Sequence, residues 1–222
     1  MLSEVSALPE GDDWLGPEER AVQAKLKLPK RRMEWRLGRL TAKRLLAPEV
    51  GIERLDRIQI IAAEDGAPEA FVDGSLLPAS LSISHRSGVA ACVASESARV
   101  GCDLEVVELR SQRFVDDFFT ERERQAIRGS HSSVRDRHVA LTWSAKESAL
   151  KLLRVGLRRD TRSVEVRIEN PDEHGAGWHR LSTTISPENH RFTGRWRLEG
   201  DVVLTVVSDD PALRVAGHDE QR

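Results

Sequence analysis

Two acidic side chains in the segment 101–105, Gly-Cys-Asp-Leu-Glu, have a spacing that suits a metal ion. In a strand, residues i and i+2 point to the same face, so Asp103 and Glu105 share one face and Cys102 and Leu104 the other. Adjacent carboxylates repel each other unless a cation or a proton lies between them. The pattern predicts either a divalent-cation site or, more simply, two solvent-facing acids on an edge strand.

A second candidate lies in the segment 143–151, Trp-Ser-Ala-Lys-Glu-Ser-Ala-Leu-Lys. On a helix, Glu147 and Lys151 are i,i+4 neighbours, which by itself indicates only a surface ion pair. If Glu147 meets the two strand carboxylates, the three acids form an oxygen site suited to Mg²⁺, which prefers carboxylates, water and phosphate. Lys151 would then neutralise charge on a leaving phosphate.

The first half of the chain carries cations that could bind phosphate. His85 follows Ser84 at the end of a predicted strand, where a turn would leave its imidazole accessible. Lys30, Arg31 and Arg32 form a run of three cations that suits a phosphomonoester. The alternatives are a surface histidine beside a capped turn and a solvated helix face.

The elements that must position these residues follow from hydrophobic periodicity and from cap, turn and proline signals. Helices are predicted from residue 17, over about 30–47 with Pro48 as the stop, from a capping box at Thr120 to about 128, and over about 134–154. Strands are predicted over 57–63, 80–84, 89–95, 100–107, 163–168, 179–185, 191–199 and 202–208. The three strands between 80 and 107 read as an antiparallel meander.

The two halves share a weak echo, in which Trp35 and Lys43 match Trp143 and Lys151 at a constant offset. A match at so few positions is thin evidence for a repeat. It suggests two related subdomains that face one another across a cleft.

Composition excludes several classes of protein. The chain has 222 residues, 34 basic and 36 acidic, with a formal net charge of −2, which argues against a polycation that coats nucleic acid. The two cysteines are too few for a disulfide framework or a structural zinc site, and we expect both to be buried and reduced. No secretory signal and no membrane span are expected, so the predicted location is the cytoplasm.

Three blocks in this order resemble the 4′-phosphopantetheinyl transferases of the two-subdomain, surfactin-synthetase-activating type: 82–85, 100–105 and 143–151. Phe118-Phe119-Thr120 before Glu123 is also similar, and the stretch 64–74 resembles members associated with polyketide synthases. The likeness runs from about 17 to 208.

The resemblance implies an α+β fold of two pseudo-symmetric α/β subdomains, each a small, mainly antiparallel sheet packed with a long helix, with the active site in the cleft between them. The N-terminal subdomain, 1–98, would bind coenzyme A. The C-terminal subdomain, 99–210, would carry the metal and the catalytic helix. Residues 211–222 are expected to be a disordered tail.

The family moves phosphopantetheine from coenzyme A to a serine of an acyl or peptidyl carrier protein. By resemblance, Asp103, Glu105 and Glu147 would hold Mg²⁺ or Mn²⁺, and Glu147 would also take the proton of the serine. Lys151 would contact the pyrophosphate. The further candidates for CoA phosphates are Ser84, His85, the weaker Lys146, and one of Lys30, Arg31 and Arg32. Position 67, where relatives often carry a basic residue, is Ala.

Partners follow from the same resemblance. The protein is expected to be a monomer, to bind neither nucleic acid nor membrane, and to receive an acidic carrier on a strip around 118–128, with Arg122 and Arg124 as charge contacts. A non-catalytic module that binds CoA or carrier proteins stays open. A Mg²⁺-dependent nuclease is less favoured, because such sites usually place the lysine two residues after the acid on a strand. Acetyl-CoA-dependent acyl transfer needs no site of three carboxylates.

Overall fold

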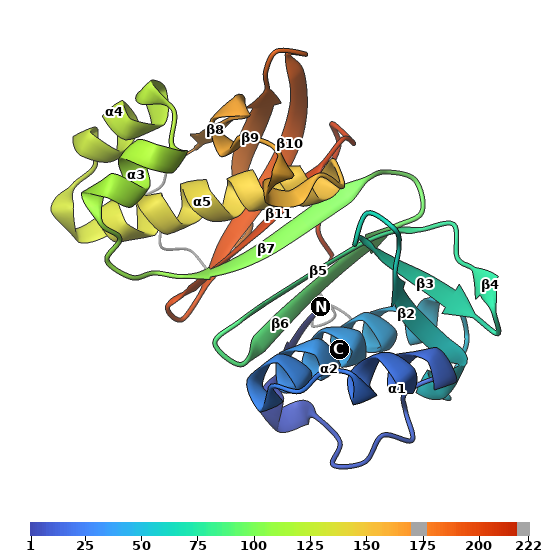
Figure 1. Cartoon of the computed structure of the whole chain (residues 1–222). Coiled ribbons are helices and arrows are strands. Elements are labelled where there is room, and N and C mark those ends of the chain that lie inside the picture. The colour runs from blue at the N-terminus through green and yellow to red at the C-terminus, as the bar shows by residue number, and fades with distance from the viewer. Residues whose placement is uncertain (170–176, 217–222) are drawn as a thin grey trace. The chain divides into compact units, whose positions relative to one another are not determined.

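The computed structural model describes residues 1–169 and 177–216 and divides the chain into two compact units (Figure 1). Unit 1 comprises Met1–Ser97, and unit 2 comprises the described residues from Ala98 onward. Five α-helices and small antiparallel sheets make up the described part of the chain, so the fold class is α+β, as predicted.

Unit 1 has two three-stranded antiparallel sheets, ordered β1-β6-β5 and β2-β3-β4. Its elements are α1 (Pro17–Ala24), α2 (Pro29–Glu49), β1 (Leu2–Glu4), β2 (Ile58–Ala62), β3 (Pro68–Val72), β4 (Ser75–Leu76), β5 (Ser80–Arg86) and β6 (Val89–Ser95). Helix α2 packs on β6, β5, β1 and β2, and α1 packs on β2. The core beneath α2 includes Leu46, Ile58, Ile60 and Cys92.

Helix α2 differs from its prediction at both ends. Pro29 is its first residue, because a proline needs no partner for its missing N–H there. Pro48 was expected to end the helix, but it lies inside the last turn. The backbone N–H of Val50 still donates to the Leu46 carbonyl at 3.1 Å, so the helical path continues past the proline to Glu49.

Unit 2 is one five-stranded antiparallel sheet, ordered β7-β11-β10-β9-β8, with α5 across one face. Its elements are β7 (Val100–Val106), α3 (Gln112–Phe118), α4 (Glu121–Gly129), α5 (Arg135–Leu152), β8 (Val164–Ile168), β9 (His179–Ile185), β10 (His190–Glu199) and β11 (Val202–Ser208). Figure 1 shows α5 running along the sheet. The core between them includes Leu141, Leu150, Leu181, Trp196 and Val203.

The predicted meander is wrong at its third strand. Strands β5 and β6 pair as expected through the turn at Ser87 and Gly88, both of which have positive φ. Strand β7 belongs to the other unit, where it pairs with β11. The second edge of β6 is occupied by β1, which sequence periodicity did not predict because only three residues form it. Elements α3, β3 and β4 were also missed.

Several smaller expectations can be checked. Cys92 and Cys102 are free and buried, as predicted. Helix α5 ends at Leu152 rather than near Gly156, since Arg154 already takes a left-handed conformation. Of the tail predicted to be disordered, 217–222 lie outside the described residues, whereas Leu213 is buried. Within the described chain, no helix combines the length and apolarity needed to cross a membrane.

Candidate active site

The predicted strand pair of carboxylates lies on β7, and both side chains are largely buried. Asp103 is 3% exposed and Glu105 is 8% exposed. Asp103 lies directly opposite Thr205 of β11, and Glu105 lies opposite Val203. Because buried carboxylates need a compensating charge, the alternative of two solvent-facing acids does not describe this strand.

The face that carries these acids is the one covered by α5. The hydroxyl of Thr205 hydrogen-bonds Ser144 at 2.8 Å and Ser148 at 2.7 Å, both on α5. Gly101, two residues before Asp103, faces the same helix: a Cβ built there would lie 1.9 Å from the Ser148 carbonyl oxygen. Glycine therefore permits the close approach of β7 to α5, which brings the strand acids beside the helix.

Helix α5 places Lys151 against the first of these acids. The Lys151 ammonium donates to Asp103 Oδ1 at 2.7 Å and to the Cys102 carbonyl at 3.1 Å. Burial lowers the pKa of Lys151, but the negative charges around it, Asp103 and Glu147 among them, outweigh this and raise the pKa above its usual value. Lys151 is therefore protonated at neutral pH and lies within electrostatic reach of two predicted ligands.

Arg110, in the loop after β7, forms an ion pair with the second acid, Glu105, and was not predicted to do so. Its Nη2 lies 3.2 Å from Glu105 Oε2 and 2.9 Å from Glu108 Oε1. Its guanidinium lies over the ring of Phe114 at 5.3 Å. The sequence offered one signal, an arginine five residues beyond Glu105 and close to a further acid.

The carboxylates are not gathered around a common point in this structure. Among the described residues, no group of three or more His, Cys, Asp or Glu side chains is close enough together to hold a metal ion. Instead Asp103 binds Lys151 and Glu105 binds Arg110. The donor set nevertheless fits a hard divalent cation in its chemistry, since it consists of carboxylates. Asp103 contacts the Lys151 ammonium at 2.7 Å, and the charge of Glu147 also acts on that group.

Lys146 has a different role from the phosphate contact that the motif suggested. It is fully buried, and its ammonium lies 2.8 Å from Glu123 Oε2. It also donates to the carbonyls of Thr161, at 3.0 Å, and Val164. Burial lowers the pKa of Lys146, and the Glu123 carboxylate partly offsets this. The ammonium is committed within the core, and we do not assign Lys146 to phosphate binding.

Trp143 lies in the aromatic cluster that supports this helix. It is buried with Val115, Phe119 and Ile127. Its ring meets Phe114 edge-on at a centroid distance of 5.0 Å. The cluster anchors α3 and α4 against α5, and Trp143 packs within it as a core residue.

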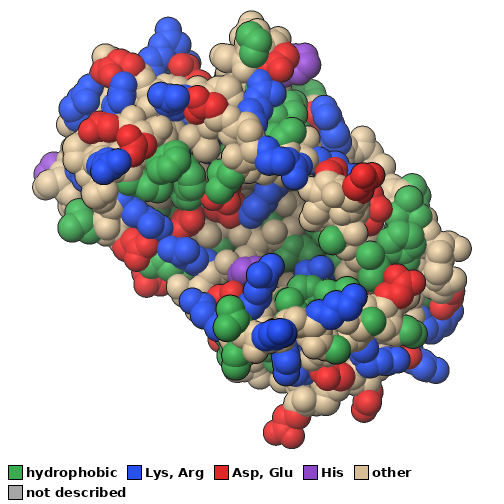
Figure 2. Space-filling model, viewed as in Figure 1, with side chains coloured by type: hydrophobic (Ala, Val, Ile, Leu, Met, Phe, Trp, Pro, Cys, Tyr) green, Lys and Arg blue, Asp and Glu red, His purple; other side chains and the backbone are tan. Residues whose placement is uncertain are grey.

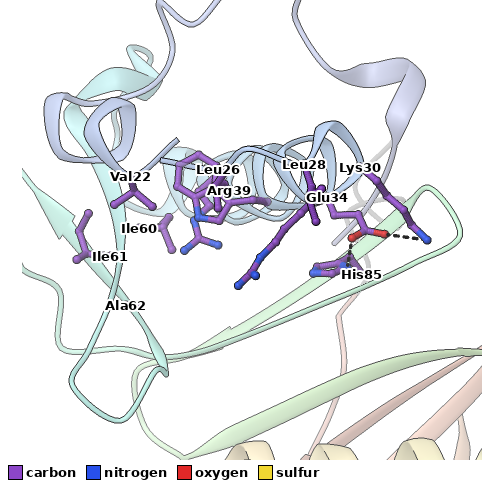
Figure 3. A pocket seen from close by; sticks show the side chains of 12 residues that line it. Val22, Leu26, Leu28, Lys30, Glu34, Arg39, Ile60, Ile61, Ala62 and His85 are labelled. Atoms are coloured by element: carbon purple, nitrogen blue, oxygen red, sulfur yellow. Dashed lines mark ion pairs between the residues drawn. The ribbon is translucent and has the colours of Figure 1, made fainter. Parts of the chain in front are cut away.

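Unit 1 contains a cavity of about 750 Å³ that collects most of the predicted phosphate cations (Figure 3). Lys30, Arg31 and His85 line it with Glu34, which lies between two of them: its carboxylate is 4.0 Å from Lys30 and 4.0 Å from His85. The remaining lining is Val22, Leu26, Leu28, Trp35, Arg39, Ile60, Ile61 and Ala62. The cavity thus pairs a cationic rim with an apolar wall.

Two of the predicted contacts are not among the residues that line this cavity. Arg32 points back along the chain, where its guanidinium donates to the Leu26 carbonyl at 2.8 Å and 3.1 Å. Ser84 is buried on the face of β5 opposite to His85, because neighbouring residues of a strand alternate. Of the three predicted cations, Lys30 and Arg31 therefore line the cavity and Arg32 does not.

Arg39, which follows Gly38 on α2, lines the same cavity and was not assigned a role from the sequence. Its guanidinium stacks on Trp35 at 4.5 Å, and its buried Nε finds no hydrogen-bond partner among the described residues. Burial lowers the pKa of Arg39 to about 10, partly offset by Glu19, so the group stays charged at neutral pH. The one feature of the sequence that could have pointed to Arg39 is the Gly38-Arg39 pair.

The strip predicted to receive a carrier protein has both signs of charge. Arg122 is exposed and pairs with Glu165 at 3.1 Å. Arg124 and Arg128 both pair with Glu121. Figure 2 likewise shows acidic and basic side chains interspersed on the visible surface. Phe118 is exposed at the start of the strip, so docking there would need an apolar contact as well as charge.

A comparison with protein families finds one similarity, and it falls within the second unit. The model described as the 4′-phosphopantetheinyl transferase superfamily matches residues 99–207. Residues 99–207, which lie within unit 2, are therefore similar to a domain of that superfamily. The matched segment contains Asp103, Glu105, Glu147 and Lys151, so the superfamily resemblance is confirmed for the part of the chain that carries them. The search of curated proteins gave no match to the chain.

Proposed function

We propose that this protein transfers 4′-phosphopantetheine from coenzyme A to a serine of an acyl or peptidyl carrier protein, with a divalent metal ion. One observation carries the proposal: the phosphopantetheinyl transferase match falls on the segment that holds three carboxylates and a protonated lysine on β7 and α5. The second product would be adenosine 3′,5′-bisphosphate.

Asp103, Glu105 and Glu147 would hold the metal ion, with Mg²⁺ preferred and Mn²⁺ acceptable to the same oxygen ligands. When bound, the ion supplies positive charge to the pyrophosphate oxygens, on which negative charge grows as the phosphoanhydride breaks. The three carboxylates would offset the charge of the ion.

Glu147 is the proposed base. It would accept the serine proton as the serine oxygen bonds to the phosphorus that bears pantetheine. The bond from that phosphorus to the bridging oxygen breaks, and its electron pair leaves with the bisphosphate. Lys151, protonated because its pKa is raised, would offset the charge on the departing phosphate.

The cavity of unit 1 is the proposed site for the adenosine end of coenzyme A. Lys30, Arg31 and Arg39 offer cations for the 3′-phosphate, and His85 offers an imidazole N–H. Planar guanidinium groups bind phosphate well. The apolar wall, including Trp35, suits an adenine ring. The contacts of Glu34 with Lys30 and His85 would have to break before these two side chains could bind the phosphate.

The test is the intact mass of an apo acyl carrier protein after incubation with this protein, CoA and Mg²⁺. A gain equal to phosphopantetheine, abolished by EDTA and by Asp103→Ala, is expected. Glu199→Gln serves as the matched control, because Glu199 is an exposed acid of unit 2 that pairs with Arg197. Full activity of Asp103→Ala would reject metal-assisted transfer.

The remaining details of the proposal come from the resemblance. They are the two-subdomain, surfactin-activating type, a polyketide-synthase carrier, a monomeric state and a cytoplasmic location. Apo carriers of the fatty-acid, polyketide and peptide kinds should be compared in the mass assay. If none gains mass while CoA still binds, a non-catalytic binding module replaces the proposal.

Charge reversal at Arg122 and Arg124 should raise the KM for the carrier if the strip 118–128 receives it.

A further inference from the structure

Arg110 is held at three points, two of which are carboxylates. Its Nη2 contacts both Glu105 and Glu108, while its guanidinium plane covers Phe114. The two acids differ in their surroundings: the Glu105 side chain is 10% exposed, and the Glu108 side chain is 46% exposed. Arg110 thus bridges a buried acid of the candidate metal site and a solvated acid outside it.

The chemistry of this bridge bears on metal binding. A guanidinium does not lose its proton in proteins, so Arg110 cannot release Glu105 by neutralising itself. A divalent cation that takes Glu105 as a ligand must compete with Arg110 for the same oxygen. Glu108 and Phe114 would keep the displaced guanidinium in place, because neither contact depends on Glu105.

We propose that Arg110 is a positioning residue that holds Glu105 as an internal counterion until a divalent cation displaces it, and that it thereby weakens metal affinity. The inference rests on the proposed function, since it takes Glu105 to be a metal ligand. Lys151 neutralises Asp103 in a similar way, but Lys151 also has a part in the transfer itself, whereas Arg110 acts only through Glu105.

The experiment titrates the full chain with Mn²⁺ alone, without CoA or carrier, and follows free Mn²⁺ by electron paramagnetic resonance. Arg110→Gln removes the competing charge and should tighten Mn²⁺ binding by roughly two- to fivefold, the worth of one partly exposed ion pair. Arg110→Lys keeps a charge and should fall between wild type and Arg110→Gln.

Glu108→Gln is a second test variant, for which we expect the opposite change in Mn²⁺ affinity. It leaves Arg110 with Glu105 as its remaining carboxylate, so Mn²⁺ should bind more weakly than in wild type. Arg113→Gln is the matched control for loss of one positive charge, because Arg113 is exposed on α3 and pairs with Asp117 at 3.4 Å. Its Mn²⁺ affinity should equal that of wild type.

The inference is overturned if Arg110→Gln leaves Mn²⁺ affinity unchanged or weakens it. Equal tightening in Arg113→Gln would also overturn it, because net charge alone would then explain the effect. Circular dichroism checks that each variant folds, and the Glu108→Gln arm decides if Arg110→Gln does not. If the wild-type protein transfers phosphopantetheine but Arg110→Gln binds Mn²⁺ with wild-type affinity, this inference alone is rejected. If the wild-type protein neither binds Mn²⁺ nor transfers phosphopantetheine, the proposed function is rejected too.

Discussion

Each unit buries a glutamate and a lysine side by side, and the two pairs are built alike. In unit 1, Glu19 accepts hydrogen bonds from the backbone N–H groups of Gly16 and Ile60, each at 2.9 Å, and pairs with Lys43 of α2. Gly16 precedes α1 and Ile60 lies in β2, so one carboxylate ties a short helix, a long helix and a strand together.

Unit 2 repeats the arrangement. Glu123 accepts from the backbone N–H groups of Thr120 and Val166, each at 2.7 Å, and pairs with Lys146 of α5. Thr120 precedes α4, and Val166 lies in β8. The internal equivalent of Lys43 is therefore Lys146, which corrects the register of the sequence echo that had matched Lys43 with Lys151.

The difference between the units lies one residue further along each long helix. After Lys43 comes Arg44, which is exposed and donates to the Ala7 carbonyl at 3.3 Å. After Lys146 comes Glu147, the proposed base. A buried pair of this kind is weak evidence for stability but good evidence for a fixed orientation. The comparison teaches that a shared core aims the helix, and that the neighbouring residue determines its chemistry.

The largest effect should come from breaking either pair. Lys43→Met or Lys146→Met strands a buried carboxylate, which typically costs about 3–5 kcal/mol of unfolding free energy. Denaturant unfolding measures the loss, with the exposed Lys27→Met as control. A loss below about 1 kcal/mol in one unit would show that its pair is dispensable and that the likeness is only geometric.

Kinetics should separate the units by the parameter that changes. Asp103→Asn should lower kcat by roughly 100-fold or more, because charge stabilisation in the transition state is lost. Arg39→Gln should raise the KM for CoA about tenfold with kcat nearly unchanged, as expected for a phosphate contact of about 1.4 kcal/mol. An effect of Arg39→Gln confined to kcat would contradict its placement in the binding cavity.

The helix–sheet approach should respond differently in the two units. Gly101→Ala drives a Cβ into the backbone of α5, and we expect it to cost about 1–3 kcal/mol and to reduce transfer as Asp103 shifts. Gly38→Ala on α2 meets only the Ile83 side chain at 3.0 Å. Relief of the helix-breaking glycine offsets that contact, so the net change should stay within about 1 kcal/mol. Thermal denaturation distinguishes the two cases.

The smallest expected effect concerns exposed ion pairs at low pH. Hydrogen bonds from Arg57 hold the pKa of Asp73 below its usual value, and Arg159 does the same for Glu188 in unit 2. Between about pH 4 and 2, the unfolded chain binds more protons than the folded chain. Each pair therefore stabilises the fold at pH values above the ordinary carboxyl pKa of about 4. That stabilisation is lost as the pH falls through the lowered pKa. Arg57→Gln and Arg159→Gln should flatten stability curves between about pH 4 and 2, to similar extents.

Most helices and strands followed from local signals. The capping box at Thr120, the proline at the start of α1 and the alternating runs near the C-terminus each sufficed. What failed was partner choice: no local pattern shows that β7 leaves β6 and joins β11. That decision depends on β1 occupying one edge and on residues about a hundred positions downstream.

The site divides in the same way. The motif order identified Asp103, Glu105, Glu147 and Lys151 as a set, and the structure places Lys151 against Asp103 at 2.7 Å. The sequence ranked Lys146 below Lys151 as a phosphate contact, but it could not show that Lys146 is fully buried and paired with Glu123. Arg110 escaped prediction since its contacts arise from the loop that follows β7.

The pairing of β7 with β11 has a consequence for synthesis of the chain. The strand with the two proposed metal ligands is the first of unit 2 to be made, and its partner is the last. Contacts this distant in sequence form late and slow folding. A growing polypeptide on the ribosome therefore carries Asp103 and Glu105 on a strand with no partner until Val202–Ser208 has emerged. The proposed transfer would therefore depend on synthesis of this last strand.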